Sequence, residues 1–325
     1  MWFVARTPSV VGTQPEQTVL PRRSVQTLTH TKFMTKQSVR HALVGYAFLL
    51  PNIVGFLLFT LGPILFSFVI SFFDWNLFSA PVFVDAANYA KIFLAKDSDF
   101  WSNLGNTMFF LIVIPFQMGI ALAMAYLLNQ KVRGILTFKV IYFVPVVVSV
   151  VSIAILWEYI LDTQNGLLNQ LLANFGVRKI SWMAEPQWIK PGISLMVVWQ
   201  SAAFSTIIYY AALQGVPDHL YEVATIDGAS KWKQFSRITF PLLAPTHFFL
   251  LITGFIGTLQ LFAPIYVMTH GVPGSARTII FEVYWKAYHE FEMGYASSLS
   301  WVLFVLIFLV SGIQWRYIGK RVHYA

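Results

Sequence analysis

The chain has 325 residues, of which 57% are hydrophobic and 11% carry a formal charge. A soluble chain has about 25% charged residues, so this composition indicates an integral membrane protein and excludes an ordinary soluble domain. The absence of cysteine excludes disulfide frameworks, zinc–cysteine clusters and thiol nucleophiles. The net charge is +8, but the basic residues are scattered between apolar segments and do not form one basic face. We therefore expect them to determine membrane topology, and we expect no nucleic-acid partner.

Residues 1–41 contain six lysines and arginines but no continuous apolar segment. We expect a flexible, basic arm on the cytoplasmic side of the membrane. A cleaved signal peptide is not expected, because the first apolar run begins too late and is too long. Met34 offers an alternative start, which would make the arm dispensable.

Six segments are apolar enough to cross a bilayer, since a span needs about 20 mostly apolar residues. They are residues 42–73, 104–128, 140–160, 193–213, 248–268 and 295–315. We therefore predict an all-α integral membrane protein, with one six-span domain at 42–316 and a short tail at 317–325.

The positions of lysine and arginine predict the orientation, because cytoplasmic segments of membrane proteins retain these residues. With the N-terminus inside, the inner segments hold 15 of the 22 lysines and arginines. Both termini are therefore expected to be cytoplasmic. The outer loops, each about 25 to 30 residues long, are too short for a separate domain.

The sequence lacks the common motifs of nucleotide binding and catalysis. It has no phosphate-binding G-x-x-x-x-G-K-[ST], no H-E-x-x-H and no G-x-S-x-G nucleophile elbow. The seven histidines are dispersed over loops and span ends. We therefore expect no enzymatic activity, no cofactor and no metal site in this chain.

Glu158 is the only acidic residue inside the predicted spans. A charge within the membrane is by default a functional hypothesis. Its neighbours Trp157 and Tyr159 favour the structural alternative, a residue in the aromatic belt at the interface. Carriers driven by protons or sodium usually bury several ionisable groups. A secondary carrier is therefore kept only as the alternative function.

Several amide and tyrosine side chains lie within the predicted spans. Amides in transmembrane helices usually form hydrogen bonds between helices. The functional alternative is a path for a hydroxyl-rich solute such as a sugar, which suits neutral donors and aromatic rings. The candidates for this path are Asn106, Gln117, Gln200, Tyr209, Tyr210 and Gln260.

Residues 215–245, between the fourth and fifth spans, contain three acids and three bases. Pro217 and Asp218 predict a helix start. Gly228 is expected to end this helix in a left-handed conformation, and Asp227 is expected to cap the next helix.

The second helix of this segment is expected to carry one apolar stripe of Trp232, Phe235 and Ile238, and to end at Pro241 and Pro245. A lipid-surface helix would not need an acidic first half. We predict a hairpin that inserts into a groove of a soluble partner.

The pattern Glu222-x-Ala224-x-x-Asp227-Gly228-Ala229, followed by Phe235, Ile238, Pro241 and Pro245, resembles the EAA signature of permease subunits of binding-protein-dependent ABC importers. Val223 departs from the usual alanine. Asn88-Tyr89, Asn106-Thr107 and the segment 294–300 are similar to the carbohydrate-uptake branch of this family, which includes maltose and glycerol-phosphate permeases. The segment 269–274 departs from that branch's Thr-x-Gly-Gly-Pro.

The resemblance implies a type I importer fold in a bacterial inner membrane. It also implies four kinds of partner: a second permease subunit in a heterodimer, two ATPases that hold ATP and magnesium, an external solute-binding protein, and the lipid membrane. The expected substrate is a sugar or oligosaccharide. Similarity to permeases of alginate-oligosaccharide importers adds an acidic sugar to the candidates.

By the same resemblance, residues 215–245 form the coupling hairpin that docks in a cleft of one ATPase. Glu222 would anchor it by polar contacts, and Gly228 would make its turn. The residues assigned to coupling are Glu222, Ala224, Asp227, Gly228, Ala229, Phe235 and Pro241. A membrane enzyme and a scaffold that recruits a cytosolic protein without transport are the remaining alternatives.

Overall fold

The computed structural model describes residues 36–95, 98–130 and 134–317. The predicted arm at 1–41 and tail at 317–325 lie almost wholly outside these ranges. The chain forms two compact units, Met1–Phe59 and Thr60–Ala325. The boundary between them falls inside the range 42–316 that we predicted as one domain.

The first unit contains α1 (Lys36–Phe56). A π-helical turn at Leu57–Leu61 continues it into α2 (Gly62–Ile70), so that Leu43–Ile70 is one apolar helical segment of 28 residues. The predicted first span, 42–73, extends three residues too far, because the chain leaves the helix at Ser71. Most apolar side chains of α1 are exposed, which suits a helix surrounded by lipid.

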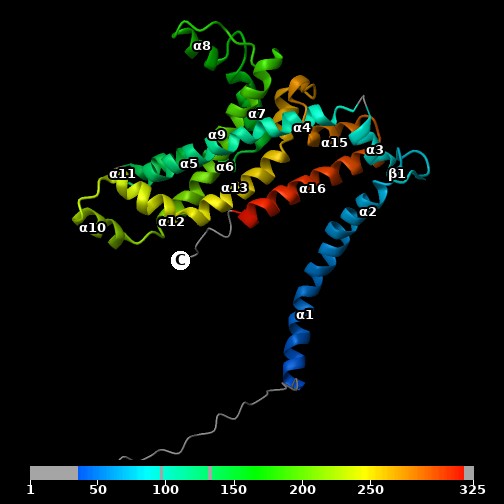
Figure 1. The fold of residues 1–325 in the computed structure, drawn as a ribbon, viewed down its shortest axis with the longest axis horizontal. Coiled ribbons are helices and arrows are strands. Elements are labelled where there is room, and N and C mark those ends of the chain that lie inside the picture. The colour runs from blue at the N-terminus through cyan, green and yellow to red at the C-terminus, as the bar shows by residue number, and fades with distance from the viewer. Residues whose placement is uncertain (1–35, 96–97, 131–133, 318–325) are drawn as a thin grey trace, which may run out of the picture. The chain divides into compact units, whose positions relative to one another are not determined.

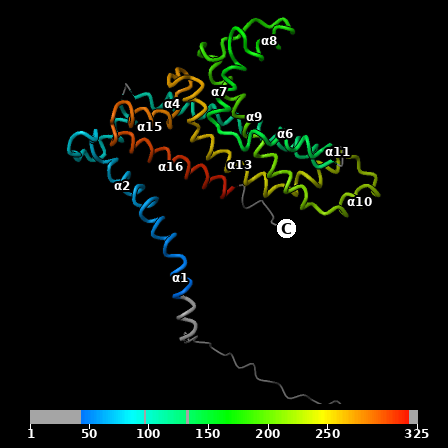
Figure 2. Tube along the Cα trace, turned by 180° about the vertical axis from the view of Figure 1, so that it is seen from behind, coloured from blue at the N-terminus to red at the C-terminus, as the bar shows by residue number. Residues whose placement is uncertain are grey.

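The centre of the second unit is the packing of α5 (Val113–Leu128) along α9 (Pro186–Leu213). Helices α6 (Ile135–Val147) and α13 (Ala244–Leu259) pack against this pair, and α16 (Met293–Tyr317) packs on α13 (Figures 1 and 2). Buried apolar side chains fill the contacts between α5, α9 and α13. The remaining elements are α3 (Ala87–Leu94), α4 (Phe100–Phe109), a 3-10 turn (Phe110–Ile112), α7 (Val150–Ile160), α8 (Leu167–Ala173), α10 (Asp218–Ile226), α11 (Lys231–Gln234), a π-helical turn (Phe235–Thr239), α12 (Phe240–Leu242), α14 (Ala263–Met268), a 3-10 turn (Gly274–Ala276) and α15 (Ile279–Tyr288).

A two-stranded antiparallel ribbon, β1 (Phe73–Asp74) and β2 (Val82–Phe83), follows α2. The Asn88 amide donates hydrogen bonds to the carbonyls of Ser71 and Phe73, at 2.9 and 3.0 Å. Gly294 lies against this ribbon, where a Cβ atom would come within 1.7 Å of the Phe73 carbonyl oxygen. Asn88 therefore ties α3 to the end of α2 and to β1, and the lack of a side chain at Gly294 lets α16 start against this ribbon.

The third predicted span, 140–160, is not one straight helix. Helices α6 and α7 meet at an angle of 105°, and Val148 and Ser149 between them have extended backbone conformations. Pro145 removes one backbone donor shortly before this bend. Ile153 and Ala154 of α7 are buried in the cluster that includes Ile265 of α14. This packing favours the bent path.

The fifth predicted span, 248–268, is also interrupted. Helix α13 ends at Leu259, and α14 restarts at Ala263 with Pro264 in its first turn, where the missing N–H has no cost. At its other end, α13 meets the Lys231–Leu242 segment at 63°. Among the described residues, four helices are long and apolar enough to span a membrane, or up to six if each bent pair is one span.

Candidate functional site

The turn of the hairpin between α10 and α11 has the backbone geometry of a Schellman motif. Gly228 has a φ of +74°, and its N–H donates to the Thr225 carbonyl at 3.1 Å. The Ala229 N–H donates to the Ala224 carbonyl at 2.9 Å. These two bonds satisfy the carbonyls at the end of α10, and the left-handed residue is one that glycine adopts without strain. The turn predicted at Gly228 is thus present.

One detail of the predicted hairpin is wrong. The N-cap of α11 is Ser230, whose hydroxyl accepts from the Lys233 N–H, whereas Asp227 ends α10. The helical segment ends at Leu242, between Pro241 and Pro245 as predicted, and Pro241 lies in the first turn of α12, where its lack of an N–H is tolerated.

Contacts within the hairpin hold its two helices together. The buried Gln234 amide donates to the Thr225 hydroxyl at 2.9 Å and to the Ala229 carbonyl at 3.2 Å. Phe235 packs between Trp232, at 5.7 Å between ring centroids, and Tyr126 of α5, at 5.5 Å. The hairpin is therefore tied by its base to the central helix pair.

The tip of the hairpin presents apolar and acidic side chains outward. Ile226 is 86% exposed and Trp232 is 74% exposed, and Val223 is exposed beside them. Glu222 and Asp227 are exposed as well. Large apolar side chains on a charged tip mark a surface suited to a protein partner.

Tyr209 and Tyr210, two of the six path candidates, lie at the base of the hairpin. The Tyr209 hydroxyl contacts Nδ1 of His247 at 2.7 Å, and Nε2 of His247 contacts the Phe240 carbonyl at 3.2 Å. The Tyr210 hydroxyl binds Lys139 and the Gln214 amide. Both tyrosines thus connect α9 to neighbouring segments.

A cavity of about 480 Å³ lies between α5, α6, α9 and α13, at the break before α14. Three of the path candidates, Gln117, Gln200 and Gln260, line it together. They come from three different helical segments that the sequence separates by 60 to 143 residues, so only the fold brings them together. The other polar lining residues are Ser201, Ser205, Thr253 and Thr258.

The carboxamides of Gln117, Gln200 and Gln260 form no hydrogen bond with any described residue. Gln117 is nevertheless only 5% exposed, and Gly254 leaves room for it, because a Cβ atom there would lie 3.0 Å from the Gln117 amide nitrogen. Buried polar groups normally have partners. The buried Gln117 amide is therefore available to a solute in the cavity, together with the half-buried Gln200 and the exposed Gln260.

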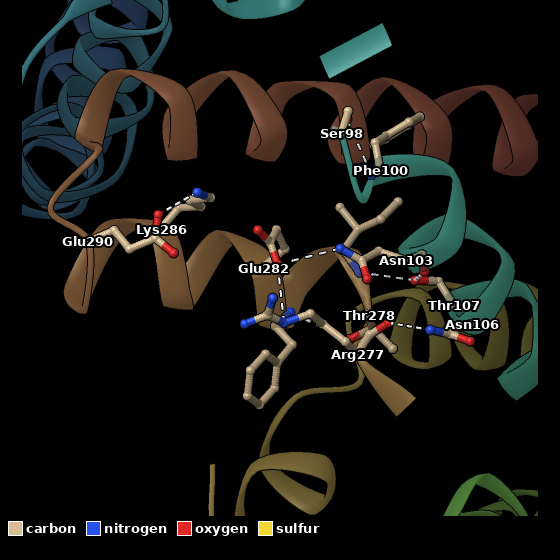
Figure 3. Close-up of polar contacts among 12 residues, drawn as sticks. Ser98, Phe100, Asn103, Asn106, Thr107, Arg277, Thr278, Glu282, Lys286 and Glu290 are labelled. Atoms are coloured by element: carbon tan, nitrogen blue, oxygen red, sulfur yellow. Dashed lines mark hydrogen bonds and ion pairs between the residues drawn. The ribbon is translucent and has the colours of Figure 1, made fainter. Parts of the chain in front are cut away.

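Asn106, the sixth path candidate, lies elsewhere, in a polar cluster made of Asn103, Asn106, Lys190, Arg277 and Glu282. Figure 3 shows the members of this cluster other than Lys190. Its amide donates to the Arg277 carbonyl at 2.9 Å, and its oxygen accepts from Lys190 at 3.0 Å. Asn106 therefore connects α4 to α9 and to the segment before α15.

Glu282 is the buried acid of this polar cluster. Its carboxylate contacts the Arg277 guanidinium at 3.3 Å and the Asn103 amide at 3.4 Å. Burial raises the pKa of Glu282, and the Arg277 and Lys286 charges partly oppose this rise. Arg277 and Glu282 were not predicted as site residues, because nothing in the local sequence distinguishes them from other loop charges.

Glu158 lies near the end of α7, where its carboxylate contacts Nε2 of His270 at 2.8 Å. It does not line the cavity. Among the described residues, no group of three or more His, Asp or Glu side chains could hold a metal ion.

Comparisons with known proteins agree with this architecture. Residues 117–324 match the family model described as "Binding-protein-dependent transport system inner membrane component". The probable ABC transporter permease protein YesP of Bacillus subtilis is 33% identical over 87% of this chain and 92% of its own length. The trehalose/maltose transport system permease protein MalF of Thermococcus litoralis is 32% identical over 84% of this chain and 92% of its own.

A solved structure with a similar fold comes from a bacterial ABC transporter involved in the import of the acidic polysaccharide alginate. It superposes with a TM-score of 0.77 over 89% of this chain and 99% of its own length, at 22% identity. At this identity the likeness shows the fold alone.

Proposed function

Since this chain belongs to the family of inner-membrane components of binding-protein-dependent transport systems, we propose that it forms half of the pathway of an ATP-driven sugar importer. As an ABC importer permease it is a multi-pass inner-membrane protein, and its sequence has no phosphate-binding loop of its own. The proposed partners are a second, different permease subunit, two ATPases that hold ATP and magnesium, and an external solute-binding protein. Both termini would lie on the cytoplasmic side.

The hairpin at 215–245 is proposed to dock in the ATPase. The observation that carries this proposal is its tip, where Ile226 and Trp232 are exposed on a turn held by the Schellman bonds and by Gln234. A rigid tip can transmit a displacement, because its base contacts Tyr126 of α5 directly, and its Phe240 carbonyl contacts His247, which bonds Tyr209 of α9. Closure of the ATPases would thus move helices that line the cavity.

The cavity is proposed to be this chain's part of the sugar pathway. Carboxamides and hydroxyls donate and accept hydrogen bonds, as sugar hydroxyls do, and Phe204 and Phe262 add aromatic surface to the lining. The relative from Thermococcus litoralis is named for trehalose and maltose transport, which supports a sugar.

Copurification tests the assembly. We expect the chain, isolated from its native membrane in mild detergent, to carry an ATPase and a second permease subunit. Reconstituted with its binding protein, the complex should hydrolyse ATP faster in the presence of a transported sugar. Absence of the ATPase would contradict the proposal and favour a secondary carrier.

Replacement of Gly228 by valine tests the coupling role. A β-branched residue at φ +74° costs about 1–2 kcal/mol locally, so the turn should distort and ATP hydrolysis should no longer drive uptake. Gly176 is a matched control, since it has the same φ of +74° and equally open surroundings in the loop after α8. Gly176→Val should leave coupling intact. Equal coupling in both variants would refute the docking role of the hairpin.

The charge of Glu222 provides a second test of docking. Because Glu222 is exposed, Glu222→Lys should leave the hairpin folded while it reverses the charge offered to the partner. We expect less ATPase to copurify. If the same amount of ATPase copurified, Glu222 would be a solvated surface acid without a role in docking.

A further inference from the structure

The lining of the cavity between α5, α6, α9 and α13 is polar but uncharged. Among the described residues that line it, none is Asp, Glu, Lys, Arg or His. The polar groups are the three carboxamides and the four hydroxyls, and the rest of the lining is apolar or glycine. This composition offers hydrogen bonds without any compensating charge.

The ionisable side chains of the surrounding helices have partners outside the cavity. Lys139 of α6 binds the Tyr210 hydroxyl, and His247 of α13 lies between Tyr209 and the Phe240 carbonyl. Glu158 of α7 pairs with His270. A charge brought into the cavity would therefore meet no opposite charge from the described part of this chain.

The electrostatic consequence depends on the surroundings. Within a membrane protein the local dielectric constant is low, so an unpaired ionised carboxylate is strongly disfavoured. A neutral hydroxyl requires only a donor and an acceptor, and the unpaired amides of Gln117, Gln200 and Gln260 supply both. The same cavity thus favours one class of sugar over another.

We infer that this chain's part of the pathway selects neutral, hydroxyl-rich sugars against uronates and other anionic sugars. The inference rests on the proposed function, because it assigns the substrate class of the same cavity. It also separates this chain from the fold neighbour described for alginate, an acidic polysaccharide.

Accessibility of an introduced cysteine tests the inference, because the native chain has no cysteine. Thr253→Cys is a suitable reporter, since Thr253 lines the cavity while its hydroxyl bonds only within its own helix, to Phe249 and Leu250 carbonyls. Gln170→Cys, on the exposed loop helix α8, is the control reporter. In the reconstituted complex, the rate of labelling of this chain by a neutral maleimide is measured with maltotriose, cellotriose, trigalacturonate or trimannuronate.

We expect at least one neutral trisaccharide to slow labelling at residue 253 and to stimulate ATP hydrolysis. Protection by the uronates should require at least about tenfold higher concentration, because an unpaired charge is penalised more than an unpaired neutral group. Labelling at residue 170 should not change. When Gln200→Lys is added to the Thr253→Cys reporter, the concentrations of neutral sugar and of uronate needed for protection should become more similar. Gln200→Met should not have this effect.

Two results would overturn the inference while the importer assignment stands. One is equal or stronger protection by a uronate with Gln200 intact. The other is stimulation of ATP hydrolysis by a sugar that gives no protection at residue 253. If no ATPase associates, or if no sugar stimulates the complex, the proposed function fails and this inference fails with it.

Discussion

Two polar regions of the second unit differ in how their side chains are paired. In the polar cluster of Asn103, Asn106, Lys190, Arg277 and Glu282, each side chain has a partner on another element. In the cavity, the carboxamides of Gln117, Gln200 and Gln260 have none among the described residues. Paired groups hold helices together, whereas unpaired groups remain available to a solute. Pairing, more than residue type, separates a structural role from a binding role.

Removal of Arg277 should have the largest effect on stability. Arg277→Leu removes the one cation that the buried Glu282 carboxylate contacts among the described residues, and breaking such a buried pair costs about 3 kcal/mol. Unfolding of the purified complex in SDS would measure this loss. Arg277→Lys keeps the charge and should lose less. A loss within about 0.5 kcal/mol, as is usual for surface substitutions, would show that the polar cluster does not stabilise the fold.

Asn106→Leu should have the next largest effect. It removes the hydrogen bond to the Arg277 carbonyl and the acceptor for Lys190, and an unpaired polar group costs about 1–2 kcal/mol. We expect lower stability in SDS with unchanged sugar specificity. Altered sugar specificity with unchanged stability would contradict this structural role and would indicate that Asn106 contacts the sugar.

Gln117→Leu should have the opposite effect to Asn106→Leu: it should impair the response to sugar and leave stability almost unchanged. Because the Gln117 amide has no partner among the described residues, its loss should change the free energy of unfolding by less than about 1 kcal/mol. Sugar-stimulated ATP hydrolysis should fall. Gln314→Leu is a matched control, since the Gln314 side-chain oxygen is also buried without a partner but does not line the cavity. Equal effects of the two variants on ATP hydrolysis would contradict the binding role.

The smallest expected effect concerns pH. Helix α15 lies outside the candidate spans, and burial raises the pKa of Glu282 in the folded state. The folded state then holds this proton more tightly, so stability is greatest below the ordinary carboxyl pKa and declines as pH rises toward the raised value. Unfolding measured from about pH 4 to about pH 7 should show this decline. Glu282→Gln should flatten it, and an unchanged slope would assign the dependence to another group.

The sequence predicted the elements whose signals are local. The turn at Gly228 was predicted because the end of a helix in a left-handed conformation selects glycine. The start of α10 was predicted from Pro217 and Asp218, and the existence of long apolar helices from their length. The capping residue Ser230 was missed because Asp227 offered an equally good local signal three residues earlier.

The bends were not predictable in the same way. Pro145 and Pro264 mark possible breaks, but the 105° turn between α6 and α7 follows from the packing of α7 against α14. A hydropathy pattern depends only on the residues along a short stretch of chain, so it cannot predict a bend that is caused by contacts with a distant helix. The hydropathy pattern therefore located the spans at 140–160 and 248–268 but did not predict that their helices bend or break.

The sequence alone determined that this protein is a membrane protein with a charged hairpin that resembles the EAA signature, because both follow from the order of residues over short distances. The tertiary structure decided which of the six path candidates meet. Three carboxamides face one cavity, while Asn106, Tyr209 and Tyr210 bind neighbouring helices. Asn106, Tyr209 and Tyr210 meet partners that lie 171, 38 and 71 residues away along the chain, so their pairing is a property of the fold.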